Sequence, residues 1–221
     1  PMQALLKRAC AVLCLLLLWG PVQAGEWELA RQKDGITVYT REVADSAFRE
    51  FRGEVEIAAN INSLMAVLDD TANFTQWMHQ CVEAKLLHKE SLLERYQYLV
   101  NDFPWPAADR VLLLRNRISQ ASDRVVTVSL EGVVPDALPV QAKNALPENK
   151  SAKWVKHAKG FYRLTPMGDT RTAVEFQLHL DPAGALPASL VNSLIVDNPF
   201  DTLRQLRDQV ADAKYAHFDP F

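Results

Sequence analysis

The stretch DFPWPAADRVLLLRNRI, from Asp102 to Ile118, joins a proline-bracketed tryptophan to an apolar run that also contains arginines. If a strand begins at Arg110, successive side chains point to opposite sides, so positions 110, 112, 114, 116 and 118 share one face. The other face holds Val111, Leu113, Arg115 and Arg117. A sheet that curls around a hollow needs inward arginines to be paired or to meet a polar ligand, whereas a one-sided sheet leaves them in solvent. Neither face is wholly apolar, so periodicity alone favours neither arrangement.

Alternating apolar and polar residues predict further strands on both sides of this stretch. In residues 48–57, Phe51, Gly53, Val55 and Ile57 fall on one face and charged residues on the other, which is typical of antiparallel sheet with one buried face. We expect strands at residues 36–41, 48–57, 82–88, 93–100, 110–118, 124–130, 160–165 and 172–180. Turn residues separate most of them, so the pattern predicts a meander of hairpins.

Helical spacing predicts helices in the first half of the chain. Residues 27–34 are amphipathic and end at Gly35, so they read as one helix. Asn60 can cap a helix over residues 61–68, and a short helix is expected around Phe74, Trp77 and Met78.

Two later segments depart from the sheet pattern. Residues 131–153 contain three prolines and no sustained period, so they are predicted to form a long loop, and such loops are often functional. From Pro187, a residue suited to a first helical turn, a helical region closes the chain. Pro199 is expected to kink or break it and to push Asn198 away from helical geometry.

Residues 1–24 have the form of a secretory signal peptide. Lys7 and Arg8 precede an apolar run, and Val22-Gln23-Ala24 has the small-x-small pattern of a cleavage site. The apolar run is shorter than the roughly 20 residues that span a bilayer, which disfavours a retained anchor. We therefore expect cleavage near Ala24, one domain over residues 25–221, and a periplasmic or secreted protein.

Composition and motifs argue against several classes of protein. The formal net charge of the chain is −3, and without a basic stripe no nucleic-acid partner is expected. Cys81 is the one cysteine outside residues 1–24, so we expect a hydrophobic core without internal disulfides and Cys81 as a buried hydrophobe. The histidines show no metal-binding spacing, and no nucleophile elbow or phosphate-binding glycine loop is present. We expect no catalytic residue, no metal and no cofactor.

A family resemblance decides how the opening stretch is interpreted. From about Trp27 to Arg207 the chain resembles a START (steroidogenic acute regulatory protein-related lipid transfer) domain, through the order and spacing of several motifs. These are Trp27, DGITVYTR at 34–41, Trp77, PWP at 104–106 with Asp109-Arg110, GFYRLTP at 160–166, DPxGxLP at 181–187, Asn192 and Pro199. The resemblance implies an α+β helix-grip fold, in which a curved antiparallel β-sheet wraps around a long C-terminal helix and encloses a hydrophobic cavity.

The resemblance also nominates ligand-binding residues. Arg110 matches the arginine of the family's Arg-Asp pair, but Val111 replaces the aspartate, and Asp109 lies on the opposite face. Arg115 lies near a family position whose cation points into the cavity, and a guanidinium can bind phosphate or carboxylate with two hydrogen bonds. Arg115 is therefore the leading candidate to anchor a ligand head group. The alternative is that Arg115 pairs with an acid on the sheet surface.

Trp105, Tyr96 and Tyr98 are further candidates for ligand contact. Trp105 could instead pin the turn from the core, and the tyrosines could simply cover the sheet. Residues 133–140 correspond to the loop over the tunnel entrance of START domains, which predicts a gate that opens at a membrane. The predicted gate residues are Val133, Val134, Leu138 and Leu194. A flexible connector is the alternative for this loop.

The predicted function is to bind one hydrophobic ligand, a phospholipid or a sterol-like lipid, and to carry it between membranes. A monomer that contacts membranes transiently is expected. One alternative is a cyclase-like helix-grip enzyme in which Arg115, Tyr96 or Asp109 positions the substrate or transfers a proton. Another alternative is an accessory protein that senses its ligand. The sequence assembles no recognisable nucleophile and base, so we expect a carrier rather than an enzyme.

Overall fold

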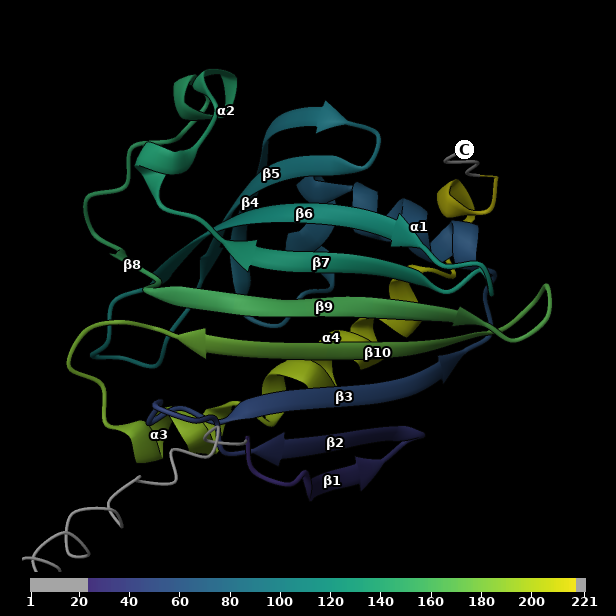
Figure 1. Ribbon diagram of the computed structural model, residues 1–221, viewed down its shortest axis with the longest axis horizontal. Helices are drawn as coiled ribbons and strands as arrows, with labels where there is room; N and C mark the ends of the chain where they lie inside the picture. The colour runs from purple at the N-terminus through teal and green to yellow at the C-terminus, as the bar shows by residue number, and fades with distance from the viewer. Residues whose placement is uncertain (1–23, 218–221) are drawn as a thin grey trace, which may run out of the picture.

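A curved antiparallel sheet forms the frame of the computed structural model, which describes residues 24–217 (Figure 1). Its strands are β1 (Glu28–Lys33), β2 (Ile36–Arg41), β3 (Glu50–Ile57), β4 (Cys81–Ser91), β5 (Glu94–Asn101), β6 (Arg110–Gln120), β7 (Val126–Gly132), β8 (Lys153–Trp154), β9 (His157–Pro166) and β10 (Thr172–Asp181). The order across the sheet is β1-β2-β3-β10-β9-β7-β6-β5-β4, and β8 pairs in parallel with β6. Residues 1–23 of the predicted signal peptide lie outside the described residues.

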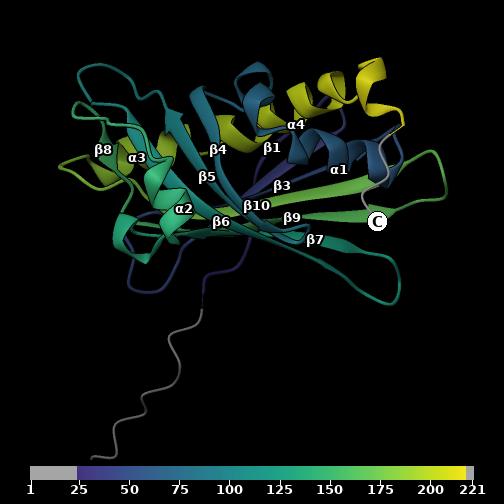
Figure 2. The same cartoon turned by 90° about the horizontal axis from the view of Figure 1, so that it is seen from above.

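Helices α1 (Ile61–Asp69) and α4 (Asp197–Gln209) lie on the same side of the sheet, as Figure 2 shows. Helix α4 contacts β2, β3 and β10, and its Leu203 and Leu206 side chains are fully buried. The remaining helices are α2 (Val140–Asn144), α3 (Ala188–Leu194) and the 3-10 helices η1 (Thr71–Gln76), η2 (Pro135–Ala137) and η3 (Ala213–Tyr215). The predicted architecture, a curved sheet that grips a C-terminal helix, is confirmed.

The two faces of the sheet pack against different segments. The concave face joins α1 and α4 in the main core. On the convex face, Tyr96, Tyr98 and Leu113 form a second core with Leu138 and Ala142. Residues 131–153 are thus not simply a loop, because they contain η2 and α2 and cover the outside of β5 and β6.

The predicted helix at residues 27–34 is wrong, because this segment forms β1 and pairs with β2 in a hairpin. Asp34 and Gly35 have φ angles of 54° and 77°, and positive φ at both turn residues is what a two-residue hairpin favours. Pairing with β2 therefore overrides the helix-favouring composition of the segment.

The predicted break at Pro199 is displaced. Helix α3 ends at Leu194 and α4 begins at Asp197, so the break precedes the proline and Asn198 is helical. Pro199 occupies the first turn of α4, where its missing N–H has no intrahelical partner to lose. The other predicted strands and the helix at residues 61–68 are confirmed to within a few residues, and Asn60 Oδ1 caps α1 by accepting the Ser63 N–H at 2.8 Å. The short helix predicted around Phe74, Trp77 and Met78 is instead the 3-10 helix η1, which includes Phe74 but ends at Gln76.

Candidate functional site

A cavity with two lobes lies between the concave face of the sheet and the helices. The space between atoms amounts to about 690 Å³ in the outer lobe and about 630 Å³ in the inner lobe, and both volumes include space that is open to solvent. The lobes share a waist, formed by His79, Asn101, Leu112, Leu178 and Asn198. Helix α3 contributes Val191 and Leu194 to the outer lobe only. Phe103, Leu180 and Leu194 of the outer lobe are half-buried, whereas residues of the inner lobe such as Leu114 and Tyr162 are buried, so the outer lobe is the mouth.

The two faces of strand β6 account for the mixture of apolar residues and arginines in residues 110–118. Arg110, Leu112, Leu114 and Asn116 face the cavity from successive depths. Val111 and Leu113, on the other face, belong to the second core. Each face of β6 is apolar along part of its length, because one face lines the cavity and the other packs in the second core. Strand β5 behaves alike, since Gln97, Leu99 and Asn101 line the cavity while Tyr96 and Tyr98 point outward.

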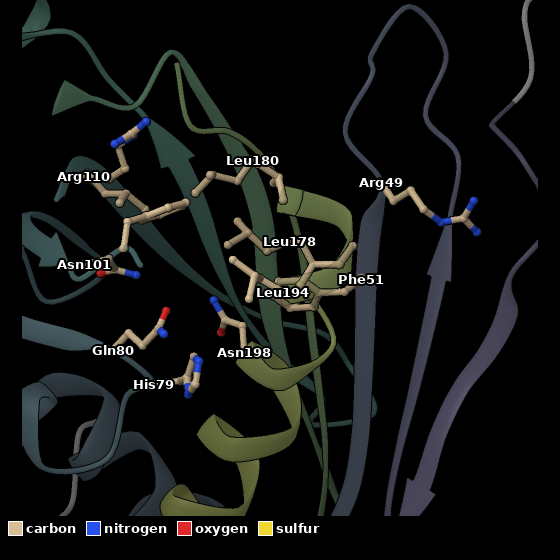
Figure 3. Close-up of a pocket in the computed structure, with 14 residues that line it drawn as sticks. Arg49, Phe51, His79, Gln80, Asn101, Arg110, Leu178, Leu180, Leu194 and Asn198 are labelled. Atoms are coloured by element: carbon tan, nitrogen blue, oxygen red, sulfur yellow. The ribbon is translucent and has the colours of Figure 1, made fainter. Parts of the chain in front are cut away.

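Arg110 lies in the wall of the mouth, but its guanidinium binds the protein backbone. Nε donates to Pro182 O at 2.7 Å, Nη2 donates to Ala183 O at 3.0 Å, and Nη1 donates to Ala108 O. Figure 3 shows the guanidinium directed away from the group of side chains around the pocket. Burial lowers the pKa of Arg110, and the Asp109 carboxylate partly offsets this effect. Arg110 therefore holds the turn after β10 and has its donors occupied.

Polar side chains gather on one side of the mouth and waist. His79, Gln80 and Asn101 lie on that side in Figure 3, facing apolar side chains that include Leu178 and Leu194. His79 Nδ1 lies 3.2 Å from Asp201 Oδ2. Burial lowers the pKa of His79, against the opposing effect of Asp201, which favours the neutral imidazole. This side of the waist is therefore polar but uncharged when His79 is neutral, while Leu112 and Leu178 make the rest of the waist apolar.

The inner lobe contains a chain of hydrogen-bonded side chains within an apolar wall. Asn116 Nδ2 donates to Gln97 Oε1, and Gln97 Nε2 donates to Thr71 Oγ1 at 2.8 Å. Tyr162 of β9 stacks on Phe176 of β10, with ring centroids 4.3 Å apart. Burial raises the pKa of Tyr162, so its phenol remains a proton donor.

Arg115, predicted as the ligand anchor, lies outside the cavity. It points to the convex side, where Nη2 donates to Glu131 Oε2 at 2.6 Å. This hydrogen bond raises the pKa of Arg115 and lowers that of Glu131. The surface ion pair, the alternative in the sequence analysis, is the arrangement observed. The physical reason is register, because odd positions of β6 face outward.

The other predicted ligand contacts also lie away from the cavity wall. Tyr96 and Tyr98 pack in the second core on the convex face, so covering the sheet is their observed role. Trp105 is 93% exposed, which contradicts a core position, and it does not line either lobe of the cavity. It lies in residues 102–109, the connection from β5 to β6, where Phe103 lines the mouth.

Of the predicted gate residues, only Leu194 lies at the mouth. Leu138 is buried in the second core, and Val133 and Val134 line a small outer pocket with Trp154. Residues 133–140 therefore do not cover the entrance, because they fold back over β5 and β6. The segments that border the mouth are α3 and the β5–β6 connection.

Three features of residues 24–217 bear on metal binding, thiol reactivity and membrane insertion. This range contains no cluster of three or more His, Cys, Asp or Glu side chains suited to a metal ion. Cys81 is buried and free, and burial raises its pKa to about 11, so it behaves as the buried hydrophobe that was predicted. Between residues 24 and 217 no helix has both the length and the apolarity needed to cross a membrane.

A sheet that holds a helix across its concave side and leaves an apolar cavity beneath it defines a container for a small molecule. The START domain family model matches residues 8–212, and the chain belongs to this family. The match begins within the segment predicted to be a signal peptide.

Three known proteins are similar to this chain over most of its length. An uncharacterized protein of Pseudomonas aeruginosa is 30% identical over 206 residues, covering 93% of this chain and 97% of that protein. The crystal structure of a STAR-related lipid transfer protein fragment from Xanthomonas axonopodis is 37% identical with a TM-score of 0.73, covering 83% of this chain and 98% of that one. Human StAR-related lipid transfer protein 5 is 15% identical with a TM-score of 0.68, covering 83% and 86%, and is similar in fold alone.

Proposed function

We propose that this protein holds one lipid or similar hydrophobic molecule in its cavity and carries it between membranes without changing it chemically. The observation that supports this proposal most is the apolar wall that continues from the mouth through the waist into the inner lobe. Burial of apolar ligand surface there contributes about 25 cal/mol per Å². The Xanthomonas axonopodis structure, which shares 37% identity, is named a lipid transfer protein, and this similarity supports the same role.

We also propose that the protein acts in the periplasm or outside the cell, and that it acts as a monomer. A carrier with a signal peptide at residues 1–24 would work in the periplasm or outside the cell, where it could meet membrane surfaces. A monomer would suffice, because one chain supplies the cavity walls described above. The enzyme alternative differs in one measurable respect, since an enzyme would convert the bound molecule into a product with a different mass or, for an isomer, a different chromatographic retention.

Blocking the waist tests the proposal. Leu112 of β6 and Leu178 of β10 both line the waist, so Leu112→Trp or Leu178→Trp should fill the passage and reduce the ligand that co-purifies about tenfold or more. Native mass spectrometry of protein from its own host measures the bound fraction, and solvent extraction identifies the molecule. Both variants should still melt cooperatively but at a lower Tm than wild type, because the two leucines pack in the main core and overpacking there costs about 1–3 kcal/mol.

Arg117→Trp is the matched control. Arg117 lies on the same strand as Leu112 but is exposed on the convex side, so its replacement should leave ligand binding unchanged. A lipid bound at equal stoichiometry in the wild-type protein and in both waist variants would show that the cavity is not the binding site. A bound molecule whose mass changes during incubation would favour the enzyme alternative.

Membrane contact is proposed to involve Trp105. Its ring is 93% exposed on a connection that borders the mouth, and tryptophan partitions favourably into the membrane interface. Trp105→Ser should lower binding to phosphatidylethanolamine–phosphatidylglycerol vesicles about tenfold in co-sedimentation, while the ligand bound per protein stays constant. Leu92, 70% exposed at the β4–β5 turn, lies at the other end of β5, so Leu92→Ser should have little effect. Equal losses for both variants would contradict docking through the mouth.

A further inference from the structure

We propose that the convex side of the sheet carries a second binding site, which takes a small carboxylic acid with an apolar body. The site is the small outer pocket beside Trp154, which we name the fork pocket and which is lined by residues 111–113, 132–135 and 154–158. Leu112 of β6 borders this pocket as well as both lobes of the cavity, so β6 separates the two sites. The inference therefore goes beyond the proposed function and does not rest on it.

The fork pocket forms where strand β6 changes its neighbour in the sheet. Val133 N donates to Leu113 O at 2.9 Å, just after β7 ends. Val155 N donates to Val111 O at 2.9 Å, just after β8 ends. Between these two points the chain runs out through η2 and α2 and returns (Figure 1). The outgoing and returning segments diverge along one edge of β6 and leave about 430 Å³ between atoms, a volume that includes space open to solvent.

Most of the lining of the fork pocket is apolar and fixed in place. Val111 and Leu113 belong to the second core, and Val133 and Trp154 pack against it. Trp154 is half-buried, so part of its indole ring is open to a ligand, and a flat ring suits an aromatic body. These walls are held before a ligand arrives, which lowers the entropy cost of binding. An apolar pocket with few polar groups is the usual form of a small-molecule site.

The polar part of the lining is cationic. None of the lining residues is Asp or Glu, and Lys156 and His157 are the titratable ones. The ring centroid of His157 lies 5.3 Å from that of His179, so His157 already has a neighbour. Lys156 is exposed and has no ion-pair partner among residues 24–217, where the paired lysines are Lys89, Lys150 and Lys214. The Lys156 ammonium is therefore free to meet a ligand at the rim.

This lining selects the charge of the ligand. An ammonium attracts a carboxylate and strengthens the hydrogen bond between them. A ligand cation would meet Lys156 without any acid in the lining to offset the repulsion. A neutral ligand would bury its apolar body equally well but would gain nothing from Lys156. Because one lysine balances one negative charge, a monocarboxylate is the class of ligand that fits.

Three probes that share one apolar body test the charge selection: phenylpropionate, phenylpropanol and phenylpropylamine. Each is titrated into the full protein, and binding is followed through the indole N–H resonance of Trp154 in NMR spectra, which Trp154→Phe assigns. Phenylpropionate should bind about fivefold more tightly than phenylpropanol, the gain expected from one exposed ion pair. Phenylpropylamine should bind most weakly. In about 1 M salt, screening should bring the three affinities close together.

Substitutions of two lysines locate the counter-charge. Lys156→Gln should bring the affinity for phenylpropionate down to that for phenylpropanol, whose own affinity should not change. Lys156→Arg should keep the preference for the acid, because it keeps the charge. Lys153→Gln is the matched control, since Lys153 is also exposed but does not line the pocket. Equal losses in Lys156→Gln and Lys153→Gln would refute the role of Lys156.

A variant on the concave side separates the fork pocket from the cavity. Leu178 lines both lobes of the cavity but not the fork pocket, so Leu178→Trp should leave phenylpropionate binding unchanged. Loss of binding in this variant would place the probe in the cavity and overturn the assignment. A wild-type protein that binds phenylpropionate but holds no lipid would refute the proposed function and leave this inference standing.

The remaining outcomes also decide the inference. Equal binding of the three probes at low salt, or a preference that survives Lys156→Gln, would refute charge recognition by Lys156. No shift of the Trp154 resonance with any probe would refute the site. A shift produced by phosphatidylglycerol vesicles, with the free probes silent, would refute a small-molecule ligand and assign the fork pocket to a lipid surface.

Discussion

Arg110→Leu should lower the free energy of unfolding by about 3 kcal/mol or more, which for a domain of this size lowers Tm by roughly 10 °C. Arg110 donates to the carbonyls of Ala108, Pro182 and Ala183, and hydrogen bonds from a charged donor to buried acceptors are among the stronger ones. Leucine leaves these carbonyls without that donor and also ends the stacking of the guanidinium on Phe103. Urea unfolding followed by circular dichroism measures the loss.

Two further variants separate this mechanism from a loss of charge. Arg110→Lys keeps the charge, but an ammonium cannot span three carbonyls in a planar fork, so its stability should fall between wild type and Arg110→Leu. Arg115→Leu removes an arginine from the same strand on the exposed side, where its partner is Glu131. Exposed ion pairs contribute about 0–1 kcal/mol, so Arg115→Leu should change stability little. Equal destabilisation by Arg110→Leu and Arg115→Leu would refute the backbone-anchoring role.

The two arginines also show what the sequence could and could not predict. Alternation along β6 correctly separated Arg110 and Asn116 from Arg115 and Arg117. It could not identify the inner face, because Leu112 and Leu114 on one side match Val111 and Leu113 on the other. The second core, formed by residues distant in sequence such as Leu138 and Ala142, is what makes the outer face apolar. That packing has no local signal in the chain.

Elsewhere the chain carries a local signal for the structure that forms. Asp34-Gly35 is a strong hairpin dipeptide, and it predicts a strand before β2 despite the helix-favouring residues of 28–33. A proline is tolerated in the first turn of a helix, and it can also break a helix. The sequence around Pro199 fits either role, so it does not show whether a helix ends before Pro199 or is kinked there. Strands with one charged face, such as β3, were predicted well because solvent on one side gives a clear alternation.

The candidate site was predicted less well than the fold. The sequence favoured Arg115, Trp105, Tyr96 and Tyr98, which lie outside the cavity, whereas the polar groups of the waist and the inner lobe are amides, an imidazole and one tyrosine. Asn116 had a usable signal, because a polar amide in the middle of an apolar strand needs a partner when buried. The sequence has no local signal that places Tyr162 or His79 in the cavity wall, since their position opposite β6 depends on how the sheet bends.

Gly53→Ala should lower the free energy of unfolding by about 1–3 kcal/mol through overpacking, although alanine normally stabilises a strand relative to glycine. A Cβ at this position would lie 2.8 Å from Leu203 Cδ1 and 2.9 Å from Pro199 Cβ. Leucine can rotate away, but the proline ring is fixed to the backbone of α4. The helix must therefore move off β3, and Gly53→Val, with its branched side chain, should cost more than Gly53→Ala.

A double-mutant cycle with Leu203→Ala tests this cause. Leu203→Ala alone should cost about 2–5 kcal/mol, because it leaves a cavity beneath α4. In the double variant the new methyl group occupies part of that cavity, so the combined cost should be smaller than the sum of the single costs by about 1 kcal/mol. Strict additivity would mean that Gly53 does not set the separation between β3 and α4. Because α4 also supplies Asn198 to the waist, the Gly53 variants should in addition release the bound ligand faster than wild type.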